Sequence, residues 1–240
     1  MKYLLLLMTL VISGNSSATT SDQYKSTLIS EPVNSTISKI ELKVREAAVK
    51  VHAPGAGHGS GSYLVHKGFH FILTAQHVAD GVLGSTYMIS KDGEFLPGIL
   101  TYSNEVDDMA VLYLPTQFVD VKPMRYKPAK SILEIGKQIT YSGYPSSHAL
   151  MTIRGRVAGH EMKPSAGKQI ILHTYGWFGC SGSVIYDEEG TVVGVLWGVD
   201  AEYYPSTAVV EDMIWVAPIQ KLNIDIPIRT ICAHNDLKFC

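Results

Sequence analysis

The segments FHFILTAQHV, residues 69–78, and GCSGSVIY, residues 179–186, decide the fold class of this chain. Each combines a short run of aromatic, aliphatic or β-branched residues with a turn that carries a polar side chain. The first apolar run ends just before His77, and the second run follows a glycine-rich turn that contains Ser181. Short apolar runs bounded by turn residues predict β-strands.

The same pattern continues outward from both segments, from about residue 43. Turn sequences such as KDG at 91–93 and DEEG at 187–190 separate the apolar runs. Strands are expected at 48–52, 61–65, 69–74, 86–90, 98–102 and 110–114, and again at 138–142, 151–159, 169–173, 183–186, 192–197 and 212–217. These two series, on either side of the stretch 116–130, predict an all-β barrel or sandwich rather than a parallel α/β fold. Only 218–224 is expected to form a short helix, with Pro218 in its first turn.

The composition argues against a nucleic-acid partner. The chain has 240 residues, 46% of them apolar, and a formal net charge of -2. Nucleic-acid-binding proteins usually concentrate Lys and Arg on one face, and no such excess is present, so no nucleic-acid partner is expected. The length is sufficient for one or two compact units with a full apolar core.

The N-terminus predicts export. Met1 and Lys2 form a short positive region, residues 3–12 are almost entirely apolar, and small residues lead up to Ala18. This is the pattern of a signal peptide at 1–18, cleaved after Ala18. The apolar run is about half the length needed to cross a bilayer, so no stable membrane insertion is expected. We therefore expect a secreted or periplasmic protein, in which 19–42 form a linker or propeptide-like arm.

Three cysteines fit an oxidising compartment. Cys232 and Cys240 are close enough in sequence to form a small disulfide loop at the C-terminus, although two free thiols on a loose tail are the alternative. Cys180 then stays unpaired. The histidines do not suggest a metal site, because they lack an acidic or cysteine partner at ligand spacing; they are His52, His58, His66 and His70. No metal or other cofactor is expected.

Three local patterns carry chemistry, in the order His77, Asp108 and Ser181. A serine hydroxyl is a weak nucleophile at neutral pH, so a neighbouring imidazole has to accept its proton during attack. That imidazole needs a carboxylate to fix its tautomer and stabilise the cation that forms. The tetrahedral oxyanion needs hydrogen-bond donors, for which the backbone N–H groups of Gly179 and Ser181 are the candidates. Each pattern alone is unspecific, whereas the combination indicates acyl transfer.

These segments resemble the trypsin-fold (chymotrypsin-like) serine peptidases, in particular the short bacterial HtrA-type protease domain and the glutamyl-endopeptidase branch. The resemblance covers roughly 44–225 and includes GKQ at 136–138, SGYP at 142–145, TIRGRV at 152–157 and GVLWG at 194–198. It implies two six-stranded antiparallel Greek-key barrels with the active site in the cleft between them, and a short C-terminal helix. The barrels would occupy 43–118 and 119–225, followed by a tail at 226–240. No PDZ domain is expected, because too few residues follow the second barrel.

The chain departs from this family at two positions next to the reacting groups. Asp107 competes with Asp108 for the role of the acid, and the family pattern of acid, any residue, Ala and two aliphatic residues favours Asp108. Cys180 precedes Ser181 where pancreatic enzymes have an aspartate, so activation by N-terminal insertion is not expected. Cys180 could itself be the nucleophile, as in viral cysteine enzymes of this fold, but the positions of the surrounding glycines favour Ser181.

The expected substrate pocket is uncharged. Tyr175 resembles the floor of the family's primary pocket, and Leu196, Trp197 and Gly198 resemble its wall. Glutamyl endopeptidases have a histidine where this chain has Leu196, which argues against glutamate preference; small or apolar side chains are expected instead. The function that follows is an exported serine endopeptidase acting on polypeptides. A non-catalytic binding or scaffolding protein on the same fold is the alternative, and the sequence does not indicate an oligomeric state.

Overall fold

The computed structural model describes residues 36–55, 57–202, 206–233, 237 and 240. Every helix and strand described below belongs to one compact unit, Ser38–Cys240. The expected signal peptide at 1–18 and most of the expected arm at 19–42 lie outside the described residues.

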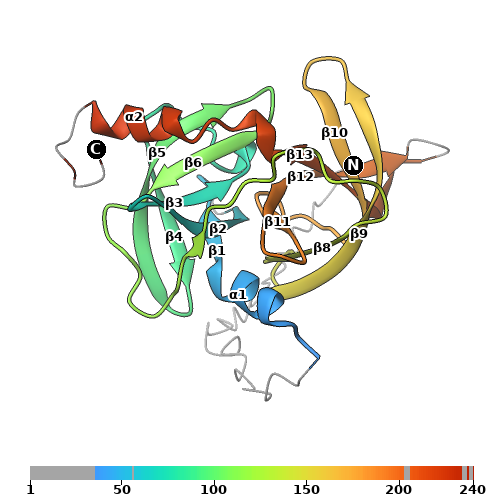
Figure 1. The fold of residues 1–240 in the computed structure, drawn as a ribbon, viewed down its shortest axis with the longest axis horizontal. Coiled ribbons are helices and arrows are strands. Elements are labelled where there is room, and N and C mark those ends of the chain that lie inside the picture. Colours follow the sequence, from blue (N-terminus) through green and yellow to red (C-terminus); the bar gives the residue numbers. More distant parts are fainter. Residues whose placement is uncertain (1–35, 56, 203–205, 234–236, 238–239) are drawn as a thin grey trace, which may run out of the picture. The chain divides into compact units, whose positions relative to one another are not determined.

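The first six strands close into an antiparallel barrel (Figure 1). They are β1 (Ala48–His52), β2 (His58–His66), β3 (Phe69–Thr74), β4 (Thr86–Lys91), β5 (Glu94–Asn104) and β6 (Met109–Tyr113). The order around the barrel is β1-β2-β3-β6-β5-β4, and pairing between β4 and β1 closes it. The short strand β7 (Met124–Arg125) pairs in parallel with β2, beyond the expected end of the first barrel at 118.

The second six strands form another closed antiparallel barrel. They are β8 (Gln138–Gly143), β9 (Met151–Lys163), β10 (Gly167–His173), β11 (Val184–Asp187), β12 (Val192–Glu202) and β13 (Ala208–Pro218). The order around this barrel is β8-β9-β10-β13-β12-β11, which repeats the connectivity of the first. The predicted fold class, two six-stranded antiparallel barrels with a short C-terminal helix, is confirmed.

Two apolar clusters stabilise the barrels. The first fills the β1–β6 barrel and continues through side chains of the second, including Tyr186 and Val195. The other lies inside the second barrel around Tyr141 and Leu172. Because the first cluster spans both barrels, burial of apolar area fixes one barrel against the other. Residues carried by loops at their junction are therefore held on a packed scaffold.

The C-terminal helix begins later than the sequence suggested. Pro218 is the last residue of β13, a 3-10 turn η3 (Ile219–Lys221) follows, and the α-helix α2 runs over Asp225–Cys232. Pro227 lies in the first turn of α2, where its missing N–H breaks no intrahelical hydrogen bond. The helix packs against β5 and β6 of the first barrel (Figure 1), and a disulfide joins its last residue, Cys232, to Cys240. No helix within the described part of the chain is long and apolar enough to cross a membrane.

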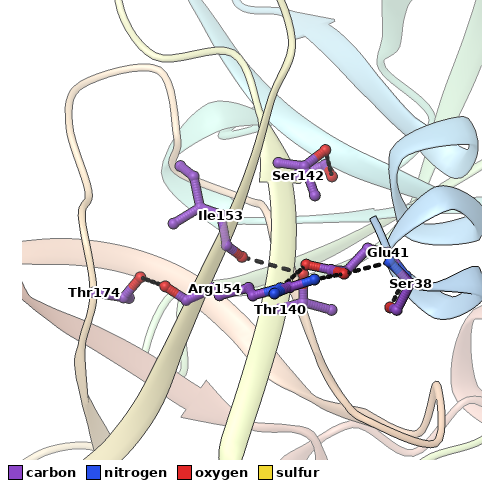
Figure 2. Close-up of polar contacts among 8 residues, drawn as sticks. Ser38, Glu41, Thr140, Ser142, Ile153, Arg154 and Thr174 are labelled. Carbon is purple, nitrogen blue, oxygen red and sulfur yellow. Dashed lines mark hydrogen bonds and ion pairs between the residues drawn. The ribbon is translucent and has the colours of Figure 1, made fainter. Parts of the chain in front are cut away.

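Helix α1 (Lys39–Ala47) was not predicted. Ser38 accepts a hydrogen bond from the N–H of Glu41 and Glu41 accepts one from the N–H of Ser38, which is a capping box. The buried Glu41 carboxylate also forms an ion pair with Arg154 of β9, as Figure 2 shows. The hydrogen bond with Arg154 lowers the pKa of Glu41 to about 2. The ion pair attaches α1 to the second barrel.

Candidate active site

His77 and Asp108 are in direct contact. His77 lies in the single 3-10 turn η2 (Gln76–Val78), which directly follows β3, and Asp108 directly precedes β6. The Nδ1 atom of His77 is 2.6 Å from Oδ2 of Asp108, and the His77 backbone N–H donates to Oδ1 at 2.8 Å. One carboxylate therefore holds both the ring and the backbone of the histidine. The imidazole is half exposed, which leaves its other nitrogen accessible.

The neighbouring acid, Asp107, has different partners. Its Oδ1 atom lies 2.8 Å from Nζ of Lys221, and its Oδ2 atom accepts from the side-chain amide of Asn104. Asp108 adopts a φ of 49°, in the left-handed region, and its carboxylate faces His77 while that of Asp107 faces Lys221. Of the two candidate acids, the structure brings only Asp108 into contact with the histidine.

Ser181 lies on a turn that contacts both barrels. Its carbonyl oxygen accepts from the backbone N–H of Ser60 in β2, at 2.7 Å. The next N–H, that of Gly182, donates to the carbonyl of Leu196 in β12, also at 2.7 Å. Ser181 is partly exposed to solvent.

Glycine is required on this turn at two positions. Gly179 and Gly182 have φ values of +92° and +87°, a backbone conformation that residues with a side chain rarely adopt. A Cβ at Gly182 would lie 2.2 Å from both the Ser60 carbonyl oxygen and Oγ1 of Thr74, and one at Gly179 would lie 2.4 Å from the carbonyl oxygen of Tyr144. The turn is therefore pressed directly against β2, β3 and the end of β8.

The candidate oxyanion donors are available for a ligand. Within the described part of the chain, the N–H groups of Gly179 and Ser181 donate to no protein acceptor. The carbonyl of Phe178, which shares a peptide group with the Gly179 N–H, accepts from Ser146 at 2.6 Å and so fixes the direction of that N–H. In the same part of the chain, no hydrogen bond joins the His77 ring to Ser181. Such contacts are often long in unliganded enzymes and shorten when substrate binds.

A hollow of about 370 Å³ opens beside His77 and Asp108. Trp197 and Lys163 contribute to its wall. The ammonium group of Lys163, at the end of β9, lies 3.5 Å from the ring centre of Trp197 and 4.8 Å from that of Trp215. Sequence reasoning did not find Lys163, because this contact depends on how the β9–β10 hairpin folds over β12.

The other expected pocket residues are dispersed. Leu196 is buried in the second barrel and contacts the turn through its backbone. Gly198 follows Trp197 in β12 and pairs with Trp215. Tyr175 lines a different hollow with His173 and Asp212, and its carbonyl accepts from the hydroxyl of Tyr141. Trp197 is thus the one expected pocket residue that lines the hollow beside His77.

Cys180 is fully buried in the core of the second barrel and is not part of a disulfide. Burial raises the pKa of its thiol. A thiol reacts as its thiolate, so this environment disfavours nucleophilic chemistry at Cys180.

The histidines of the first barrel have separate contacts. Each interacts with a different group: His52 with Ser90, His58 with the carbonyl of Tyr144, His66 with the ring of Tyr126, and His70 with the hydroxyl of Tyr63. These four histidines lie in strands β1, β2 and β3.

Comparison with known proteins identifies the family. The model of the family described as "Trypsin-like peptidase domain" matches residues 59–195, more than half of the chain. The chain belongs to this trypsin-like peptidase family, whose substrates are polypeptides. No curated protein sequence matches the chain.

Solved structures share the fold at low sequence identity. The active form of the Rv3671c protease from M. tuberculosis is 15% identical, with a TM-score of 0.63 over 84% of this chain and 87% of the other. An inactive form of the same protease, carrying a serine-to-alanine mutation, is also 15% identical and gives a TM-score of 0.62 over 83% and 93%. The serine endoprotease from Yersinia pestis is 18% identical, with a TM-score of 0.57 over 77% of this chain and 64% of the other.

Proposed function

We propose that the chain is an exported serine endopeptidase that hydrolyses peptide bonds through Ser181, His77 and Asp108. The observation that carries the proposal is the 2.6 Å contact between Nδ1 of His77 and the Asp108 carboxylate. The turn of Ser181 lies against the segment that leads to His77, since a Cβ at Gly182 would lie 2.9 Å from the backbone nitrogen of Ala75. With Nδ1 occupied by the carboxylate, the tautomer is set so that Nε2 is the free base. Family membership supports the proposal independently, because the matched segment includes all three residues.

The reaction follows from the roles of these atoms. Oγ of Ser181 attacks the carbonyl carbon of the scissile peptide, and Nε2 of His77 accepts the hydroxyl proton. Asp108 stabilises the imidazolium that forms. The N–H groups of Gly179 and Ser181 bind the developing oxyanion. Collapse of the tetrahedral intermediate breaks the C–N bond as His77 returns its proton to the leaving amine.

Hydrolysis of the acyl-enzyme repeats these steps with water. His77 removes a proton from water, the hydroxide attacks the ester carbonyl, and the bond to Oγ of Ser181 breaks with return of a proton to the serine. The enzyme needs no cofactor for either half of the reaction, since a base, a nucleophile and an oxyanion site are sufficient.

We extend the proposal to substrate preference and location. The hollow beside His77 would receive residues on one side of the scissile bond, with Trp197 as an apolar surface. A primary pocket without a fixed charge would favour small or apolar side chains. Export is supported by the disulfide between Cys232 and Cys240, because such bonds persist in oxidising compartments.

Hydrolysis of denatured casein tests the proposal. The wild-type protein should release peptides, and Ser181→Ala should reduce the rate to background. Cys180→Ala is the matched control at the adjacent position and should retain most of the rate. Absence of hydrolysis by the wild type against casein and a mixed peptide library would support the alternative of a non-catalytic binding protein.

A further inference from the structure

We propose that Ser60 of β2 is a positioning residue that holds the turn of Ser181 in its reactive conformation. This inference rests on the proposed function, because it assigns Ser60 a role in the same reaction. Ser60 has no exposed surface and lies 2.7 Å, through its backbone nitrogen, from the carbonyl oxygen of Ser181. It belongs to the first barrel, whereas the turn belongs to the second.

All the polar atoms of Ser60 are engaged. Its hydroxyl donates to the carbonyl of Gly179 at 2.7 Å and accepts from the N–H of Tyr144 at 2.9 Å. Its own N–H donates to the carbonyl of Ser181, and its carbonyl accepts from Oγ1 of Thr74 at 2.7 Å. A buried residue with every donor and acceptor satisfied has a defined orientation, because loss of any one bond leaves a buried polar group unpaired.

Two of these bonds restrain the turn from both sides. The carbonyls of Gly179 and Ser181 flank the peptide group that carries the Ser181 N–H, one of the two proposed oxyanion donors. Ser60 therefore holds the peptide groups on both sides of the donor through two buried hydrogen bonds. The peptide group that carries the Ser181 N–H is held by its own carbonyl, that of Cys180, which accepts from the N–H of Ser183 at 2.9 Å. Because a peptide group is planar, these bonds together set the direction of the donor.

Ser60 also relates the turn to the histidine. Thr74, which donates to the Ser60 carbonyl, is the last residue of β3 and lies three positions before His77. The contact is tight, because a Cβ at Gly59 would lie 2.8 Å from the carbonyl oxygen of Ser181 and 2.4 Å from Cγ2 of Val78. Ser60 and its neighbour in β2 therefore connect the strand that carries the general base to the turn that carries the nucleophile.

The test compares Ser60→Ala with Ser62→Ala. Ser62 lies two positions further along β2 and is 2% exposed, and within the described residues it makes no hydrogen bond to the turn. We expect Ser60→Ala to lower kcat by roughly 10- to 100-fold with KM changed less than about threefold, as for a group that acts mainly in the transition state. Binding of a peptide aldehyde, whose hemiacetal oxygen occupies the oxyanion site, should weaken in parallel. Ser62→Ala should leave both quantities within about threefold of wild type.

Deuterium exchange supplies a measurement that does not depend on turnover. Backbone amides of the peptide that covers 176–183 should exchange faster in Ser60→Ala than in wild type or Ser62→Ala, because the turn has lost its anchor. If Ser60→Ala does not fold, Thr74→Val removes the donor to the Ser60 carbonyl at nearly constant volume and should give a smaller loss of kcat in the same direction.

The outcomes separate the two proposals. Wild-type protein without hydrolytic activity would refute the proposed function, and exchange at 176–183 would then decide whether Ser60 anchors the turn. Hydrolytic wild-type protein with unchanged kcat, aldehyde affinity and exchange in Ser60→Ala would overturn the role of Ser60 alone. Equal losses in Ser60→Ala and Ser62→Ala would also overturn it, since they would indicate a general effect on β2.

Discussion

Lys221 and Asp107 form an ion pair in which Nζ lies 2.8 Å from Oδ1. Because of this pair, the carboxylates of the neighbouring residues Asp107 and Asp108 have different partners. Lys221 belongs to η3, after the second barrel, and its ammonium group also donates to the carbonyl of Ala166 in the β9–β10 hairpin. Asp107 is therefore held away from the histidine, while Asp108 faces it. The contact joins three segments that are far apart in the sequence.

Replacing each acid by its amide should give unequal effects. Asp108→Asn removes the carboxylate that fixes the His77 tautomer, so kcat/KM should fall by about 10³- to 10⁴-fold. Asp107→Asn removes only the partner of Lys221, so kcat/KM should fall less than about tenfold. Steady-state hydrolysis of a peptide substrate measures both. Equal losses in the two variants, or the larger loss in Asp107→Asn, would contradict the assignment of the acid.

Gly182→Ala should be far more damaging than Gly93→Ala. Both glycines have φ near +88°, with values of +87° and +89°, so alanine is strained at either position. The strain alone costs about 1–2 kcal/mol. A Cβ at Gly93 meets nothing within 4 Å, whereas one at Gly182 lies 2.2 Å from the Ser60 carbonyl oxygen. Thermal unfolding and peptide hydrolysis should show a modest shift for Gly93→Ala and loss of activity or of soluble protein for Gly182→Ala.

Comparing the two glycine variants distinguishes the effect of backbone strain from the effect of a steric clash at the new Cβ. A similar loss of stability and activity in the two variants would indicate that φ alone is limiting and that the turn is not pressed against β2. Normal activity in Gly182→Ala would contradict the packing of the turn directly.

The ion pair between Glu41 and Arg154 should make stability depend on pH in acid. Hydrogen bonding to Arg154 lowers the pKa of Glu41 from 4.5 to about 2 in the folded protein. A lowered pKa contributes stability that is fully present above the unfolded value and is lost as the pH falls toward the folded value. The contribution should therefore fade between about pH 5 and pH 2. Arg154 is 61% exposed, so solvent screens the pair and its contribution to stability should be small.

Arg154→Met tests this contribution, with Arg156→Met on the same strand as the control. Urea unfolding at pH 7 should show a lower free energy of unfolding for Arg154→Met, and the difference from wild type should shrink at pH 3. Arg156 is not paired with an acid in the described part of the chain, so its variant should resemble wild type at both pH values. A difference for Arg154→Met that does not change with pH would argue against the ion pair shown in Figure 2.

Cys180 should be dispensable for hydrolysis. Its side chain is buried and burial raises the pKa of the thiol, so little thiolate forms near neutral pH. Treatment with iodoacetamide for about an hour at about pH 7.5, where ordinary thiols react, should leave the rate of peptide hydrolysis unchanged. Mass spectrometry measures alkylation of Cys180, and an activity assay measures the rate. Rapid alkylation of Cys180 with parallel loss of activity would instead favour the cysteine as nucleophile.

Local sequence patterns were sufficient for most of the fold. Each expected strand overlaps an observed one, because short apolar runs bounded by turn residues are visible in the local sequence. Strand β3 at Phe69–Thr74 matches its expected range completely. The C-terminal helix was misplaced, since Pro218 ends a strand paired with β12 rather than starting a helix. Helix α1 was missed although the capping-box residues Ser38 and Glu41 were present, because the serine- and threonine-rich residues before them suggested an arm.

The site could be predicted only in part. His77, Asp108 and Ser181 follow local patterns, whereas the residues that orient them do not. Ser60 lies far from Ser181 in the sequence, and Lys221 lies far from Asp107. Such contacts depend on closure of each barrel and on packing between barrels, which short-range patterns do not encode. Lys163 could not be predicted for the same reason, because its ammonium group contacts the ring of Trp197 in a different hairpin.

Covalent labelling with a fluorophosphonate, followed by peptide mapping, tests the central claim most directly. The probe forms a bond between its phosphorus and Oγ of an activated serine, with loss of fluoride, and requires the neighbouring base. We predict one adduct, on Ser181, in the wild type and in Cys180→Ala, and none in Ser181→Ala, with strongly slowed labelling in His77→Ala. An unlabelled wild-type protein, or an adduct that persists in Ser181→Ala, would contradict the account.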